Sequence, residues 1–353
     1  MRLQLIVVAV LAIPAVARAQ TEFVSKVQVY VDNDHTEVVS PLIRAQADVT
    51  PTWNVSAGYV ADIVTSASVD IVSQASKTTI HDVRHQGSFG VSKTLEDWTL
   101  HGSYIYSTEN DYASHNLGGG LERRLAENDT TLSVGGGVSL NDVGRSHDLN
   151  FHRNLTVGEI NIAVTQVLAP TLVGQLGYTF GVAQGYQASP YRFVPVHDAN
   201  GTTMSWVPEN DPDQRFRHAA VAGLNWLAGK DTAVQLDYRI YHDTWDITSH
   251  TIQVRLLVEL TPSVELRLRN RFYVQNGALF YASNYTDFEQ YMTFDRELSP
   301  FWSDLVGGKL SWKVVPTVEI EGKVDVFYFA YSDFPLLPSR TGANVESGIS
   351  LTY

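Results

Sequence analysis

The sequence has no cysteine among its 353 residues. A chain without cysteine cannot carry a lipoprotein anchor, a disulfide framework, a thiolate metal site or a c-type haem attachment. Basic residues are also scarce, because 25 Lys and Arg stand against 38 Asp and Glu and give a formal net charge of −13. A nucleic-acid-binding protein would need a basic stripe instead. These absences exclude several classes of function and leave an acidic chain without covalent cross-links.

Long hydrophobic runs are missing from most of the chain, and the one apolar run lies at the N-terminus. Arg2 precedes the apolar stretch 3–12, and Ala17, Arg18 and Ala19 form a small-x-small cleavage site. This pattern predicts a Sec signal peptide over residues 1–19. No later segment reaches the ~18 apolar residues of a membrane-spanning helix. Without a Pro/Gly/Ser-rich linker, residues 20–353 are predicted to form one domain.

The stretch 249–275 shows the pattern that organises the rest of the chain. Apolar residues alternate with polar ones on both sides of the turn Thr261-Pro262-Ser263: Ile252, Val254, Leu256, Val258 and Leu260 before it, and Val264, Leu266, Leu268, Phe272 and Val274 after it. A period of two indicates β-strands with one apolar face. These strands are longer than the five or six residues of a typical soluble strand, and a membrane-spanning strand needs about nine to eleven. The pattern therefore favours a transmembrane hairpin.

The same alternation predicts an antiparallel transmembrane β-barrel of about 16 strands, with 14 as the alternative. The predicted strands are 24–31, 37–49, 54–64, 79–93, 97–107, 114–125, 130–140, 155–168, 172–182, 216–227, 232–241, 250–260, 264–275, 301–312, 318–331 and 344–353. Short turns such as 50–52 and 261–263 alternate with long loops at 66–78, 183–215 and 276–300. Outer-membrane barrels have short periplasmic turns and long extracellular loops, so both chain ends are expected on the periplasmic side.

Aromatic residues are expected to form two girdles on the outside of this barrel. Four tryptophans lie within a few residues of the short turns: Trp53, Trp98, Trp226 and Trp312. The opposite girdle is predicted from aromatic residues several positions further along the strands: Tyr30, Tyr106, Tyr178, Phe180, Tyr238, Phe272 and Tyr328.

Charged residues on the polar face of the strands are expected to line the lumen, because an arginine facing lipid at mid-membrane would cost about 2–4 kcal/mol. The predicted lumen residues are Asp237, Arg239, Arg255, Glu259, Glu265, Arg267, Arg269, Arg271, Glu319, Glu321, Lys323 and Asp325. Such rows can select ions by sign in an open barrel, or neutralise one another in a filled one. The sequence leaves both possibilities open.

Metal and enzyme signals are weak. Asp32, Asp34, His35 and Glu37 are candidate ligands in the first loop, and His242, Asp243, Asp246 and His250 in a later one, but acidic residues also favour tight turns. His81 and His85 are expected to be lumen side chains. No G-x-S-x-G, H-E-x-x-H or Gly-rich phosphate loop is present, so the sequence predicts neither an enzyme nor a cofactor.

Four segments resemble a known family. The runs GYQASPYRFV (185–194), PDQRFRHA (212–219), DYRIYHDTWDITSHT (237–251) and RNRFYVQNGALFY (269–281) are similar to the bacterial domain-of-unknown-function family thirty-five seventy, and the loop 62–76 is similar to its N-terminal signature. Gln187 and Phe272 depart from the family pattern. The resemblance implies an exported outer-membrane barrel whose gene lies beside those of a flavin-attaching transferase and a small lipoprotein, and it supplies no catalytic residue.

Together these features predict an outer-membrane barrel that acts as a channel or conduit for small polar or charged solutes. Alternatives are a non-conducting sheath or docking platform for an envelope redox or secretion assembly and, less favoured, an outer-membrane hydrolase. The expected partners are outer-membrane lipid and lipopolysaccharide, the barrel-assembly machinery and an envelope lipoprotein or redox protein, but no nucleic acid. The alternating C-terminal residues Ile349, Leu351 and Tyr353 resemble the signal that the assembly machinery reads.

Overall fold

The computed structural model describes residues 20–66, 80–146, 148, 150–198 and 200–353, so the predicted signal peptide at 1–19 lies outside the described residues. Within these ranges, sixteen strands close into one antiparallel barrel, and two further strands form a separate hairpin. The barrel strands are β1 (Thr21–Asp32), β2 (Thr36–Thr50), β3 (Trp53–Ser66), β4 (Ile80–Leu95), β5 (Trp98–Thr108), β6 (Tyr112–Leu125), β7 (Thr130–Val143), β8 (Arg153–Ala169), β9 (Leu172–Gly185), β12 (Gln214–Gly229), β13 (Thr232–Asp243), β14 (Thr248–Thr261), β15 (Val264–Gln275), β16 (Phe301–Val315), β17 (Val318–Tyr331) and β18 (Ser339–Thr352). The predicted barrel of about 16 strands is confirmed, and the alternative of 14 is wrong.

The first and last strands close the barrel. β1 and β18 pair antiparallel from Glu22 opposite Thr352 to Asp32 opposite Gly342. The backbone amides of Thr21 and Tyr353 each donate to the other residue's carbonyl, at 3.1 and 2.9 Å. A closed sheet leaves no unpaired edge, which is the condition for a β-structure in lipid. The two strand ends therefore meet on one rim.

The hairpin turns on this rim are short and are held by their own side chains. The hydroxyl of Thr50 accepts hydrogen bonds from the amides of Thr52 and Trp53, at 3.3 and 3.1 Å. Thr261 accepts one from the amide of Ser263 in the same way, at 3.3 Å. These local bonds satisfy backbone groups that the sheet leaves unpaired at the turn.

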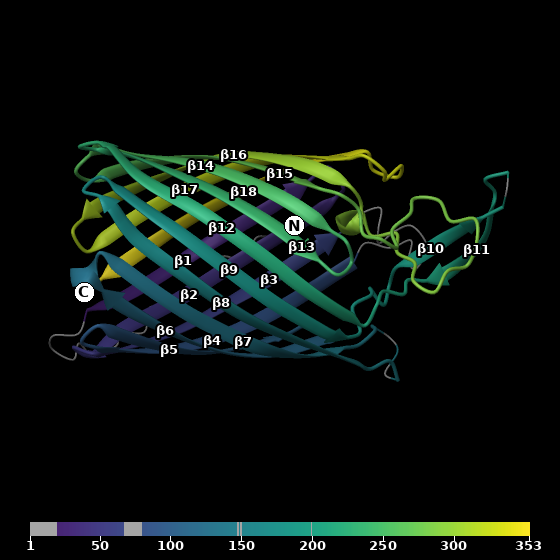
Figure 1. Ribbon diagram of the computed structural model, residues 1–353, viewed down its shortest axis with the longest axis horizontal. Helices are drawn as coiled ribbons and strands as arrows, with labels where there is room; N and C mark the ends of the chain where they lie inside the picture. Colours follow the sequence, from purple (N-terminus) through teal and green to yellow (C-terminus); the bar gives the residue numbers. More distant parts are fainter. Residues whose placement is uncertain (1–19, 67–79, 147, 149, 199) are drawn as a thin grey trace, which may run out of the picture.

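The opposite rim carries the long loops. Between β9 and β12, the strands β10 (Phe193–His197) and β11 (Thr203–Pro208) form a hairpin that the sequence analysis left as loop. This hairpin projects beyond the barrel, away from the rim that holds the C-terminus (Figure 1). The segment 276–300 lies between β15 and β16 and contains a short 3-10 helix, η2 (Arg296–Leu298).

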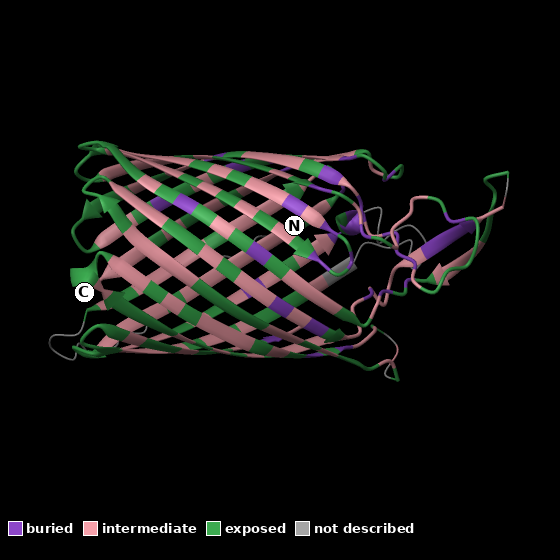
Figure 2. Ribbon diagram, in the orientation of Figure 1, coloured by how far each residue is buried: buried purple, intermediate pink, exposed green. Residues whose placement is uncertain are grey.

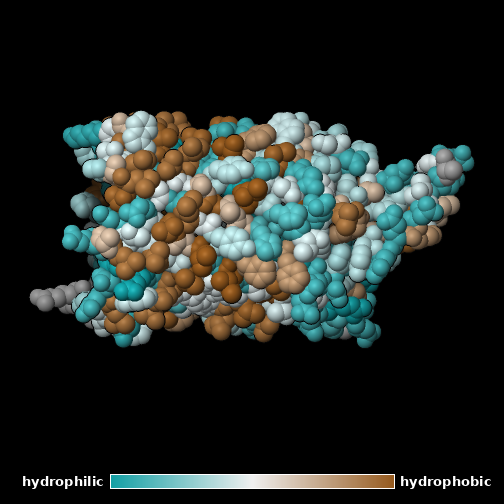
Figure 3. Space-filling view, in the orientation of Figure 1, coloured by the Kyte–Doolittle hydropathy of each residue, from teal (hydrophilic) through white to brown (hydrophobic). Residues whose placement is uncertain are grey.

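The outer face of the barrel is apolar and exposed. Val254, Leu268 and Val306 have 40%, 44% and 58% of their surface accessible. Their side chains are wholly apolar, so exposure to water would be unfavourable. In Figure 3, apolar side chains cover much of the barrel towards the turn rim, and the loop rim and projecting hairpin are mostly hydrophilic. Strands such as β8, with 17 residues, exceed the length that a membrane requires. They therefore extend past the apolar belt on the loop side.

The conventional hydrophobic core lies at the loop rim and not within the barrel wall (Figure 2). Val194 and Val196 of β10 are fully buried. They belong to a cluster completed by aromatic and sulfur-containing side chains of the loops and strand ends: Tyr285, Met292, Phe294, Phe301, Tyr331 and Phe334. Burial of this cluster fixes the projecting hairpin and the segment 276–300 to each other and to the ends of β16 and β17. Within the described ranges, no helix has the length and apolarity to cross a membrane.

Candidate functional site: the barrel lumen

The register of β13–β17 places all twelve predicted lumen residues on the inward face of the sheet. Asp237 pairs with Gln253 of β14, which pairs with Arg271 of β15. Their sequence neighbours Leu236 and Phe272 belong to the exposed apolar outer face. Side chains on one strand alternate between faces, so the same register turns the other predicted charges inward: Arg239, Arg255, Glu259, Glu265, Arg267, Arg269, Glu319, Glu321, Lys323 and Asp325.

Most of these charges are engaged in ion pairs, either within one strand or between strands that are neighbours or next-neighbours in the barrel. The guanidinium of Arg269 donates to both carboxylate oxygens of Asp325, at 2.8 and 2.6 Å, and the ammonium of Lys323 lies 3.3 Å from the same carboxylate. Glu321 lies between Lys26 and Lys309 in the same manner. Such alternating pairs neutralise one another and hold β15–β18 and β1 together on the lumen side.

Glycine at position 307 makes the central pair possible. Gly307 lies on β16 between Arg269 and Asp325, and a Cβ atom there would overlap the Asp325 carboxylate. Only a residue without a side chain lets the two charges meet across the intervening strand. Asp325 is 1% exposed as a result.

On β12–β15, three inward-facing arginines make no ion pair with any residue that the structure describes: Arg217, Arg239 and Arg271. Arg239 lies 5.2 Å from the ring centre of Tyr241, which does not neutralise its charge. Arg217 and Arg239 are on β12 and β13, and Arg271 is on β15. This wall of the lumen consequently carries positive charge that can attract anions.

The opposite wall is lined by small residues, which the sequence analysis missed. The register of β4–β8 directs mainly serine, glycine and asparagine inward: Ser88, Gly90, Ser103, Asn116, Gly118, Gly120, Ser133, Gly135, Gly137 and Ser139. The runs 118–120 and 135–137, each of three glycines, are the sequence signal for it. Short side chains leave more of the cross-section to solvent than arginines do, so the open part of the lumen lies closer to this wall.

The segment 276–300 folds against the lumen mouth. Gln275, on the inward face of β15, donates to the carbonyls of Glu297 and Ser299, at 3.0 and 2.8 Å. Arg296 of η2 pairs with Asp34, which lies in the turn between β1 and β2. These contacts hold the segment to the end of β15 and to the turn between β1 and β2.

The candidate metal ligands of the first loop stabilise the turn between β1 and β2 by hydrogen bonds and an ion pair. The Asp32 carboxylate accepts hydrogen bonds from the amides of Asp34 and Thr36, both at 3.0 Å, and from the Tyr30 hydroxyl at 2.7 Å. Asp34 is engaged by Arg296. Neither these residues with His35 and Glu37, nor any other described residues, form a group that could hold a metal.

The later acidic cluster has the same local role. Asp243 accepts hydrogen bonds from the amides of Trp245 and Ile247, at 2.9 and 3.2 Å, and pairs with Arg215. Its carboxylate thus holds the β13–β14 turn, and His242 donates to or accepts from Thr248 within that turn at 2.9 Å.

The predicted aromatic girdles lie on the outer face. Trp53, Trp98, Trp226 and Trp312 are exposed near the turn rim, and Tyr106, Tyr178, Tyr238, Phe272 and Tyr328 are exposed further along their strands. Near the turn rim, Lys93 and Arg123 lie 4.8 and 4.7 Å from the ring centres of Trp53 and Trp98. Tyr30 differs, because it faces the lumen and stacks on Phe327, with 5.5 Å between ring centres.

A repeated tyrosine–histidine pair on the outer face escaped the sequence analysis. In each pair the tyrosine hydroxyl lies 2.7 Å from Nδ1 of a histidine on the neighbouring strand: Tyr59 with His85, Tyr104 with His115, Tyr178 with His218 and Tyr238 with His250. Each tyrosine is the seventh residue of its strand, counted from the turn rim. The prediction of His85 as a lumen side chain is therefore wrong, and the side chain of His81 lies outside the description. The pairs satisfy polar groups close to lipid.

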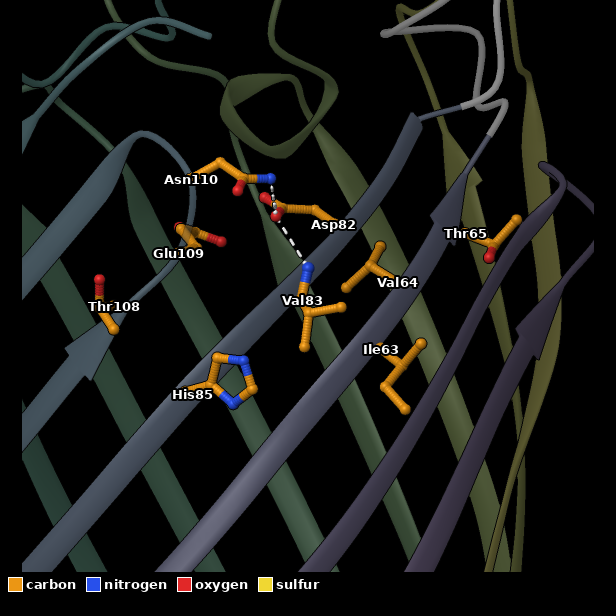
Figure 4. Close-up of a pocket in the computed structure, with 9 residues that line it drawn as sticks. All are labelled: Ile63, Val64, Thr65, Asp82, Val83, His85, Thr108, Glu109 and Asn110. Carbon is orange, nitrogen blue, oxygen red and sulfur yellow. Dashed lines mark hydrogen bonds between the residues drawn. The ribbon is translucent and has the colours of Figure 1, made fainter. Parts of the chain in front are cut away.

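A separate pocket of 390 Å³ lies where the loop-side ends of β3, β4 and β5 meet (Figure 4). The carboxylate of Asp82 accepts hydrogen bonds there from the side chain of Asn110 and the amide of Val83, both at 2.8 Å. Burial and the nearby charges of Asp82 and Asp111 raise the pKa of the Glu109 carboxyl above its ordinary value. The lining also includes His85, Thr65 and Thr108, and the His85 imidazole is hydrogen-bonded to the Tyr59 hydroxyl.

Comparison with known families decides the identity. The model of the family described as "Protein of unknown function (DUF3570)" matches residues 70–333. The chain belongs to this family. The resemblance noted in the four sequence runs is thereby confirmed. Among curated proteins, none matches this DUF3570 chain.

Solved structures share the fold of the DUF3570 protein at very low identity. A structure titled "Bacterial polysaccharide outer membrane secretin" is 8% identical, with a TM-score of 0.52 and coverage of 95% of this chain and 98% of that one. CdiB from Acinetobacter baumannii is 9% identical, with a TM-score of 0.56. The match covers 94% of this chain and 60% of the CdiB chain. At these identities the likeness shows the barrel fold alone.

Proposed function

We propose that this protein is an outer-membrane channel that conducts small anionic solutes. The observation that carries the proposal is the asymmetry of the lumen. One wall presents Arg217, Arg239 and Arg271, which have no ion pair among the described residues, and the opposite wall presents glycine and serine. A cationic wall that faces open space concentrates anions, and the low-dielectric barrel focuses its field.

Outer-membrane residence is part of the same proposal. The outward apolar belt, its aromatic residues and the short-turn and long-loop rims support it. The predicted signal peptide at 1–19 would provide export, and Ile349, Leu351 and Tyr353 on the closing strand would be recognised by the assembly machinery. Deletion of Tyr353 should slow insertion in an assembly assay with proteoliposomes that contain this machinery, whereas deletion of the loop residue Leu279 should not.

Conductance in planar bilayers tests the channel directly. The mature protein should give stepwise currents with anion preference, and Arg271→Glu should move the reversal potential in a salt gradient towards that of cations. Arg271 is a better position than Arg269, because Arg269 is tied to the buried Asp325 and its loss would disturb the wall. Lys230→Glu changes charge equally in an exposed turn and is the control. Silent protein that has inserted into the bilayer, or equal effects of both variants, would contradict the proposal.

A second candidate is a non-conducting sheath or docking platform for an envelope lipoprotein or redox protein. Exposed apolar side chains on the loop-rim segments favour it: Met204, Leu279, Phe288 and Leu336. In that case the inserted barrel would be silent, and a partner would copurify with the wild type but not with a variant carrying Met204→Ser and Phe288→Ser. The less favoured hydrolase would be supported only by turnover in lipase or protease assays, and we propose that none occurs.

A further inference from the structure

A pocket in the lumen wall combines aromatic rings with arginines. It has a volume of 480 Å³ and lies beneath η2, where β15–β18 and β1 reach the loop rim. Five of its lining residues are aromatic: Tyr30, Tyr273, Phe301, Phe327 and Phe329. Phe301 and Phe327 are buried, whereas Tyr30, Tyr273 and Phe329 are partly exposed to the lumen, where contact of a ring with water is hydrophobically unfavourable.

The rings are held in fixed positions by one another. Phe327 stacks on Tyr30 at 5.5 Å and meets Phe329 edge-on at 5.7 Å between ring centres. Gly342 lies beside Phe327 on β18, and a Cβ atom at position 342 would overlap the Phe327 ring. The absence of a side chain at 342 thus lets the ring lie flat along the wall.

Positive charge lies beside the rings. Within the pocket, Arg269 is neutralised by Asp325, and Arg340 lies 3.3 Å from Glu297 and 4.5 Å from the ring centre of Phe329. Arg271 is different, because no ion pair engages it in the part of the chain that the structure describes. The pocket therefore offers one uncompensated guanidinium.

The distance between this charge and the rings suits a small ligand. Arg271 pairs with Leu305 of β16, and Leu305 pairs with Phe327 of β17, so Arg271 and Phe327 start two strands apart. Two strand spacings are about 10 Å. Leu305 forms an apolar floor between them. A carboxylate within reach of Arg271 would place an attached ring over Leu305 and against Phe327.

From this geometry we infer that the pocket binds small aromatic carboxylates during their passage through the lumen. The carboxylate forms a bidentate pair with Arg271, and the ring packs against Phe327 and Tyr30. The inference deepens the proposed channel function and rests on it. The inference concerns ligand binding at one place in the lumen, so this binding can be disproved without disproving the channel function.

Isothermal titration calorimetry of the mature protein in detergent micelles, with empty micelles subtracted, measures the binding without current. Benzoate should bind more tightly than both cyclohexanecarboxylate and acetate. Its affinity should exceed that of cyclohexanecarboxylate by about two- to tenfold, which is the contribution of one aromatic contact. Arg271→Gln should weaken benzoate binding about ten- to a hundredfold, as loss of a charge-assisted pair does. Arg44→Gln removes an arginine on the inward face of β2, outside the pocket, and should leave benzoate binding unchanged.

A second variant protects the test against misfolding of the first. Phe327→Leu should remove the aromatic contact and reduce the preference for benzoate over acetate, with acetate binding unchanged. Folding of each variant is checked by its heat-dependent migration in dodecyl sulfate gels. Equal affinity for the three acids, or equal effects of the two arginine variants, would overturn the inference. Currents with anion preference but without selective benzoate binding would retain the channel and reject the subsite, whereas selective binding to a silent barrel would reject the channel.

Discussion

Replacing Asp325 by asparagine tests the ion pair at the centre of the charged lumen wall. Asp325 is almost fully buried, and its carboxylate forms ion pairs with the guanidinium of Arg269 at 2.6 Å and the ammonium of Lys323 at 3.3 Å. Breaking a buried ion pair by removing one partner costs about 3–5 kcal/mol. Because Arg269 is about one-third exposed, solvent screens part of its charge, and we expect a loss near the lower limit, about 3 kcal/mol.

The structure also orders related substitutions. Arg269→Met should cost less than Asp325→Asn, about 2 kcal/mol, because Lys323 still neutralises the carboxylate. Glu265→Gln breaks the 3.2 Å pair with Arg267 on the same strand, and both of those side chains are about 40% exposed. An exposed pair contributes about 0–1 kcal/mol, so this variant is the matched control.

The measurement is denaturant unfolding of the barrel in lipid vesicles, followed by tryptophan fluorescence. The double variant with Arg269→Met and Asp325→Asn should lose at least about 1 kcal/mol less than the sum of the single variants, because the two groups contact each other. Equal losses for the Asp325 and Glu265 variants, or additive losses in the double variant, would refute the claim that burial makes this pair important.

Three further predictions concern other parts of the molecule. Burial, followed by the charges of Glu209 and Asp295, raises the pKa of Asp211 in the loop rim to about 8. Folding thus favours the protonated carboxyl, so the stabilisation is full below the unfolded-state pKa near 3.8 and is lost as pH rises through about 8. Hydrogen-exchange protection of residues 186–198 and 200–213, after correction for the intrinsic rise of the exchange rate with pH, should fall over this range, and Asp211→Asn should reduce this fall. Tyr59→Phe deletes one hydrogen bond to His85 and should cost about 0.5–1.5 kcal/mol in the same unfolding assay, where no loss would show the pair to be incidental. Gly307→Ala should cost at least about 1–3 kcal/mol, the usual range for overpacking, because its Cβ overlaps the Asp325 carboxylate, and a neutral effect would contradict the close approach.

The sequence alone determined the barrel fold and a strand count of about 16, and the structure decided against the alternative of 14. In a membrane-spanning strand each residue faces either lipid or lumen, so apolar and polar residues must alternate, as they do in the stretch from Ile252 to Val274. The short turns and long loops follow from the same pattern. Local chemistry was enough because every strand pairing except the closing pair of β1 with β18 joins strands that a turn or one loop connects, including β9 with β12.

Contacts between distant residues needed the tertiary structure. Sequence alternation predicted that Arg269 faces inward, but only the register across β16 brings it to Asp325, 56 positions later, with Gly307 between them. The lumen position of Tyr30 and the outward position of His85 likewise depend on which face each strand presents after closure. Where both faces of a strand carry a mixture of polar and apolar residues, the period-two alternation does not show which face points into the lumen. Cross-strand pairing decides the orientation there, and it also determines which arginine is left without a carboxylate.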